Sequence, residues 1–89
     1  MPRASQSKRQ ELVLDSKLRE LTRLVNEIAP DARIEVSFER YEDEDAHVRV
    51  YPRRRITQDE ARRVELAVGQ RCTEILLETG LFIVGSVYD

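Results

Sequence analysis

Apolar residues along this chain follow two different spacings, and the order in which the spacing changes is the feature that most constrains the fold. Residues 8–29 carry apolar side chains three or four positions apart, which is typical of an amphipathic helix. Pro30 would end this helix, because proline disfavours helical geometry in the residue before it. Ser7 and Gln10 form a capping-box pattern that predicts its start. The apolar stripe consists of Leu14, Leu18, Leu21, Val25 and Ile28.

Apolar and polar residues then alternate in two short stretches, which predicts a pair of half-buried strands. Only an acidic segment, Glu42–Asp45, links them, so we expect a hairpin with that segment as its solvated tip. The side chains expected to face the helices are Ile34, Val36, Phe38, Val48 and Val50.

The register of this hairpin is predicted from charge. Opposite charges that face each other across an antiparallel pair contribute about 0.2–1 kcal/mol each. One register brings two such pairs together on one face of the sheet. The opposite residues expected in it are Phe38 and Val50, Glu39 and Arg49, and Glu35 and Arg53.

The second helical stretch covers residues 58–79. Thr57 and Glu60 are spaced as a capping box, and Gly80 suits the left-handed conformation that ends many helices. The run Leu81–Tyr88 is apolar on both faces and predicts a third strand. The helix stripe consists of Ala61, Val64, Val68, Cys72, Ile75 and Leu76.

The order of these elements, α-β-β-α-β, predicts an α+β fold, a two-layer sandwich with two helices packed on one face of a three-stranded sheet. The chain has 89 residues, and single domains run from about 50 to 250 residues. We therefore expect a single α+β domain over residues 7–89 and a disordered N-terminus over residues 1–6. If the second and third strands are parallel, the crossover between them should be right-handed.

The residue inventory argues against catalysis. Cys72 is the single cysteine, so no intramolecular disulfide forms, and its place in the helix stripe predicts buried packing rather than a nucleophile. His47 is the single histidine, without a partner pattern for a metal. We expect no catalytic residue, cofactor or metal, and therefore no enzyme. No apolar run approaches the roughly 20 residues that span a bilayer, and the start lacks a signal-like apolar stretch, which predicts a cytoplasmic protein without a membrane partner.

Helices on one side leave the other face of the sheet open. Three interpretations of this face remain open: an ordinary solvated sheet, a homodimer interface formed by the face or by an edge strand, and an RNA platform on which tyrosines stack bases. The expected interface residues are Tyr41, Tyr51, Phe82, Val84 and Tyr88. The face is expected to carry Glu35, Ser37, Glu39, Tyr41, His47, Arg49, Tyr51 and Arg53, with either Phe82, Val84, Ser86 and Tyr88 or the alternate residues of the third strand.

Arginines concentrate around the end of the second strand and the start of the second helix. Guanidinium groups beside a helix start suit an anion, whereas the alternative is a solvated surface with Asp59, Glu60 and Glu65 as counter-ions. The formal net charge of −2 does not favour a dedicated basic nucleic-acid binder. The predicted nucleic-acid-binding residues are Arg49, Tyr51, Arg53, Arg54, Arg55, Arg62 and Arg63.

One run, His47-Val48-Arg49-Val50-Tyr51, followed by residues 56–61 and 81–88, resembles the N-terminal domain of the RimP-type ribosome maturation factors. The element order is also similar to ribosome-binding factor A and the KH-like group, without the KH GxxG loop. The RimP-type Ser-Ser-Pro-Gly after the third strand has no counterpart here. The resemblance implies this fold and a place beside ribosomal RNA or protein. We therefore expect a non-enzymatic RNA- or ribosome-associated domain, with a homodimeric protein-interaction module as the alternative.

Overall fold

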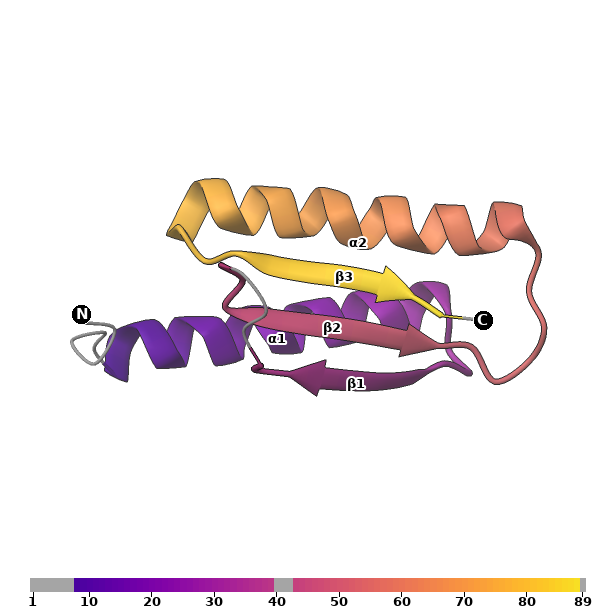
Figure 1. Ribbon diagram of the computed structural model, residues 1–89, viewed down its shortest axis with the longest axis horizontal. Coiled ribbons are helices and arrows are strands. Elements are labelled where there is room, and N and C mark those ends of the chain that lie inside the picture. Colours follow the sequence, from indigo (N-terminus) through magenta and orange to yellow (C-terminus); the bar gives the residue numbers. More distant parts are fainter. Residues whose placement is uncertain (1–7, 40–42, 89) are drawn as a thin grey trace.

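The computed structural model describes residues 8–39 and 43–88. The sheet has the order β1-β2-β3, in which β1 and β2 are antiparallel and β2 and β3 are parallel. Figure 1 shows α1 behind the sheet and α2 alongside β3, and together these elements form the predicted α+β two-layer arrangement. The elements are α1 (Lys8–Ile28), β1 (Arg33–Ser37), β2 (Ala46–Tyr51), α2 (Gln58–Thr79) and β3 (Ile83–Val87).

Helix α2 begins and ends where the local sequence signals place it. The Thr57 hydroxyl accepts the Glu60 N–H at 3.0 Å, and the Glu60 carboxylate accepts the Thr57 N–H at 2.9 Å. Gly80 is left-handed, with φ of 79°, and its N–H donates to the Leu76 carbonyl at 2.8 Å. The predicted capping box and glycine stop of α2 are confirmed. Ser7, from the other predicted capping box, lies outside the described residues.

The core lies between the helices and one face of the sheet. Two members of the predicted stripes lie at its margin, since Ile28 and Leu76 are each 40% exposed. Leu76 lies about 80° around α2 from Val68, which places it on the flank of that helix. The buried apolar residues are Leu18, Leu21, Val25, Ala46, Val48, Val50, Val64, Val68, Cys72, Ile75, Leu81 and Ile83.

The predicted register of the hairpin is wrong by four residues. The structure pairs Ile34 with Val50 and Val36 with Val48, and Glu35 lies across from Arg49. Because the shift is an even number of residues, each β1 side chain keeps its expected face. The observed register aligns two apolar pairs over the core, and burying a side chain of this size contributes about 1.5–3 kcal/mol, more than an exposed charge pair.

Phe38 does not face the helices as predicted. It follows the last residue of β1 and is 61% exposed. The acidic segment also differs from the expected solvated tip, because Glu44 is buried. The neighbouring Asp45 accounts for the burial of Glu44. The Asp45 N–H donates to the Phe82 carbonyl at 2.6 Å, and the Asp45 carboxylate accepts the Phe82 N–H at 2.8 Å. These bonds draw the end of the segment against the start of β3.

Strand β3 turns Val84, Ser86 and Tyr88 toward the open face, which settles the alternative left by its apolar pattern. Val84 is aligned with His47 and Ser86 with Arg49, both of which point away from the helices. The opposite face of β3 meets α2 closely, because a Cβ on Gly85 would overlap Cγ1 of Val68. Only glycine allows the backbones of α2 and β3 to approach this far.

Candidate functional site

The open sheet face carries three rows of side chains, one from each strand. Two residues expected there, Glu39 and Arg53, lie beyond the ends of β1 and β2, and Tyr41 lies outside the described residues. The face consists of Arg33, Glu35 and Ser37 from β1, His47, Arg49 and Tyr51 from β2, and Val84 and Ser86 of β3 with the adjoining Tyr88.

Tyr51 is held between two neighbours. The Arg33 guanidinium carbon lies 4.4 Å from the centre of the Tyr51 ring. The Tyr88 ring is stacked on it, with centroids 5.3 Å apart and planes 19° apart. Because Arg33 comes from the β1 side of β2 and Tyr88 from the β3 side, both flanks of the ring are in use. A base could stack on Tyr51 only after one of these contacts was broken.

Arg49 also belongs to the internal contacts of this face. Its guanidinium lies 3.7 Å from the Glu35 carboxylate, and its side chain is largely covered. The same carboxylate lies 3.2 Å from Arg33. Glu35 therefore neutralises arginine charge on the face. The structure thus separates Arg49 and Tyr51 from the other five residues of the predicted nucleic-acid set.

Those five arginines form what we call the arginine end, made of Arg53, Arg54, Arg55, Arg62 and Arg63. All five are exposed, three in the loop after β2 and two in the first turns of α2. Arg53, Arg54 and Arg63 line one cavity of about 110 Å³, together with Asp31 and Glu60. Arg54 lies 3.9 Å from the Asp31 carboxylate. Within residues 8–39 and 43–88, the other four arginines form no ion pair.

The start of α2 is already occupied by its own capping groups. The Glu60 carboxylate has a pKa below its ordinary value, first because it accepts the backbone N–H of Thr57, with Arg54 and Arg63 acting in the same direction. The Thr57 hydroxyl takes the Glu60 amide. The cations available at this end are therefore the arginine side chains, and the capped amides contribute little to binding an anion.

His47 lies on the open face beside Ser86. Its Nε2 lies 3.0 Å from the Ser86 hydroxyl, and its Nδ1 is buried with no hydrogen-bond partner among the described residues. Burial lowers the pKa of His47, the positive charge of Arg49 lowers it further, and the negative charge of Glu44 opposes both. In the part of the chain that is described, no three metal-ligating side chains come together.

The depressed pKa of His47 predicts a pH-dependent stability. The unfolded chain binds a proton on His47 near the ordinary pKa of about 6.5, before the folded chain does. The free energy of unfolding should therefore be highest above about pH 6.5 and should decrease as the pH falls through the unfolded pKa toward the lower folded one. Urea titrations at a series of pH values above 5 would measure this, before carboxylates begin to titrate. The same pH slope in His47→Gln would contradict the assignment.

Cys72 is buried in the helix stripe, as predicted. Burial raises the pKa of its thiol to about 11. The group is therefore protonated at neutral pH, and a thiol is a weak nucleophile in that state. Its place in the core fits packing.

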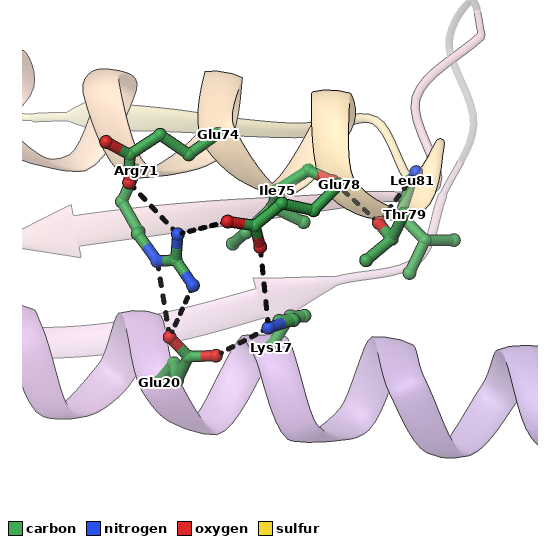
Figure 2. Close-up of polar contacts among 8 residues, drawn as sticks. All are labelled: Lys17, Glu20, Arg71, Glu74, Ile75, Glu78, Thr79 and Leu81. Atoms are coloured by element: carbon green, nitrogen blue, oxygen red, sulfur yellow. Dashed lines mark hydrogen bonds and ion pairs between the residues drawn. The ribbon is translucent and has the colours of Figure 1, made fainter.

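An ion-pair network that the sequence did not reveal joins the two helices (Figure 2). Glu20 of α1 lies between two cations, 3.0 Å from Lys17 and 2.8 Å from Arg71 of α2. Arg71 also contacts Glu74 at 3.0 Å and Glu78 at 3.4 Å. Hydrogen bonds donated by Lys17 and Arg71 lower the pKa of Glu20, and the hydrogen bonds that Arg71 donates to Glu20 and Glu74 raise the pKa of Arg71. These charges connect helices, so Arg71 is not part of the arginine end.

The fold and the arginine end together define a small α+β two-layer domain with an open sheet face and a cationic end. The chain shows no significant similarity to any protein-family model, curated protein or solved structure with which it was compared. The resemblance to the RimP-type domain stays a prediction. Neither α1 nor α2 is long and apolar enough to cross a membrane.

Proposed function

We propose that this protein is a non-enzymatic RNA-binding domain that holds the phosphate backbone of single-stranded RNA with the arginine end. The observation that carries the proposal is that unpaired arginines gather at this end, whereas on α1 Arg23 is the single described arginine side chain without a carboxylate partner. Arg19 and Arg71 on the helices, and Arg33 and Arg49 on the sheet, each contact a carboxylate within 4 Å. Four of the five arginines at the arginine end have no such partner among the described residues.

Guanidinium groups suit a phosphate ligand because each presents several N–H donors in a fixed plane. Arg53, Arg54 and Arg63 converge on one cavity from two elements of the fold. The loop 52–57 and the first turns of α2 can therefore meet consecutive phosphates of one strand. Arg49 and Tyr51 take no direct part in this proposal, since both are engaged on the sheet face.

The test is the salt dependence of RNA binding. If five arginines contact phosphates, affinity for a labelled single-stranded RNA should fall by about 100-fold between about 50 and about 200 mM salt, since each contact adds about 0.7 to the logarithmic slope. Arg53→Gln with Arg55→Gln should reduce that loss to about 20-fold and weaken binding at low salt about tenfold. Fluorescence anisotropy measures both quantities.

The matched control removes the same amount of charge from α1, which is remote in sequence from the arginine end, with Arg19→Gln and Arg23→Gln. It should keep the wild-type salt slope. An equal loss in this control would show that binding follows net charge and would place it elsewhere. No RNA binding at low salt would remove the proposal, leaving a ribosomal protein as the partner to test.

A further inference from the structure

Strand β3 is an edge of the sheet that lacks two common protections against pairing, charged residues and proline. Free strand edges offer unpaired N–H and C=O groups to other chains, and proteins commonly block them with charged residues or proline. The other edge, β1, carries Arg33 and Glu35, whereas Ile83–Val87 contains neither a charged residue nor a proline. No described strand lies beyond β3.

The backbone of β3 is oriented for pairing at this free side. The Tyr88 N–H donates to the Val50 carbonyl of β2 at 2.9 Å. Successive residues of a strand point their N–H and C=O groups to opposite sides, so those of Val84 and Ser86 also point toward β2. The N–H and C=O groups of Ile83, Gly85 and Val87 therefore point outward.

We propose that two copies of the chain pair through β3, antiparallel, about a two-fold axis at Gly85, and form a continuous six-stranded sheet. In this register Gly85 lies opposite Gly85 of the other copy, and Ile83 lies opposite Val87. These are the residues whose backbone groups point outward, so each pair exchanges two hydrogen bonds as an antiparallel ladder requires. The pairing uses the backbone of β3 and none of the arginine side chains, so the inference does not depend on RNA binding, although Val87 also lines the cavity at the arginine end.

Side chains of β3 and of the residues just before and after it also lie opposite each other under the same operation. Phe82 of one copy lies across from Tyr88 of the other, twice, and Val84 lies across from Ser86. Phe82 and Tyr88 are both 39% exposed in the single chain. Positions opposite each other without backbone hydrogen bonds have the closer side chains, and aromatic pairs across strands are favourable there. A register shifted by two residues would lose both aromatic pairs.

The exposed side of α2 around Gly69 lies close to the proposed two-fold axis at Gly85. Val68 contacts Gly85, and the next residue, Gly69, is an exposed glycine in the middle of α2. Glycine is less favourable than alanine in a helix interior, yet within the described chain no heavy atom lies within 4 Å of where a Cβ of Gly69 would be. Gly69 is about 200° around the helix from Arg71, which contacts α1, so it faces away from α1. Figure 1 shows α2 running beside β3.

Pairing with a second copy would explain why a glycine stands at position 69. Two-fold pairing at Gly85 brings the two α2 helices side by side and antiparallel near Gly69, where the missing side chain lets the backbones approach. Leu66, which is 65% exposed, and Leu76 lie on the same side of α2. The sheet and the helices thus point to one partner, an identical chain.

The first experiment is sedimentation equilibrium over a dilution series. The wild-type chain should form a dimer, and Phe82→Lys with Tyr88→Lys should weaken it about 100-fold, because two aromatic pairs are lost and like charges face each other. Leu12→Lys with Phe38→Lys is the control, since it changes two exposed apolar residues elsewhere and should leave the dimer intact. A wild-type chain that stays monomeric at high concentration, or a control as damaging as the test variant, would overturn the proposal.

Two further measurements guard against misfolding and against a different dimer. Mixing the lysine variant with Phe82→Glu and Tyr88→Glu should restore a heterodimer, which requires that both variants fold. Amide hydrogen exchange by NMR should show protection at Ile83, Gly85 and Val87 that disappears on dilution, while the amides of Val84, Ser86 and Tyr88 stay protected. Protection independent of concentration, or failure of the mixture to associate, would rule out pairing through β3.

Discussion

Replacing Leu21 with alanine is expected to lower the free energy of unfolding by about 3–4 kcal/mol. Leu21 is fully buried, at 0% exposure, between α1 and the rest of the core. Truncation removes its apolar contacts and leaves a cavity, and buried Leu→Ala changes cost about 2–5 kcal/mol. For a chain of this size that is a large share of the total stability. Urea denaturation followed by circular dichroism, at one fixed protein concentration, measures the change.

Leu12→Ala is the matched control, because it makes the same substitution in the same helix at a side chain that is 70% exposed. The change there should stay within about 0.5 kcal/mol. If Leu21→Ala cost no more than Leu12→Ala, α1 would not pack on the sheet through the face described.

Gly85→Ala is expected to have the second largest effect, a loss of about 1–3 kcal/mol from overpacking. The added methyl group would overlap Cγ1 of Val68, a β-branched side chain with little rotational freedom. Val68→Ala opens space at that point. The double variant should therefore be more stable than the sum of the two single losses predicts, with a coupling of about 1 kcal/mol or more.

Gly69, which lies within α2, provides the contrast to Gly85, because an added methyl group there has open space. Gly69→Ala meets no atom within 4 Å, so it should raise the stability of the single chain by up to about 1 kcal/mol through helix propensity. Stability should be measured here at concentrations at which the chain is monomeric. Equal destabilisation at Gly69 and Gly85 would show that the close approach of α2 to β3 is not the cause.

Local sequence signals predicted the boundaries of the elements well. The capping groups Thr57 and Glu60, and the left-handed Gly80, act over a few residues of one segment, so their geometry does not depend on the rest of the fold. The alternation in β1 and β2 likewise predicted which side chains face the helices, because a strand has a fixed period of two residues.

The register of β1 and β2 could not be read in the same way. A slip of four residues keeps every side chain on its face, so the alternating pattern allows both registers. The charge pairs considered from the sequence, such as Glu39 with Arg49, favoured the wrong one. The apolar pairs Ile34–Val50 and Val36–Val48 decided it, because their packing in and against the core contributes more.

The candidate site shows the same division. The sequence predicted a concentration of arginines after β2, but only the packed chain shows that Arg49 faces Glu35 and that Arg71 joins the helices through Glu20. These residues are 14 and 51 positions apart in sequence, respectively, from the carboxylates they contact. Which arginines remain available to a ligand is a property of the tertiary structure.

The sequence by itself determined the order of the elements, the ends of α2 and the face that each residue of β1 and β2 takes, because caps and periodicity act through neighbouring residues. The tertiary structure alone decided the strand register, the side of β3 that is buried, the engagement of Tyr51 by Arg33 and Tyr88, and the contact of Gly85 with Val68. Each of these depends on the distance between segments remote in sequence, which is set only when all the helices and strands share one core.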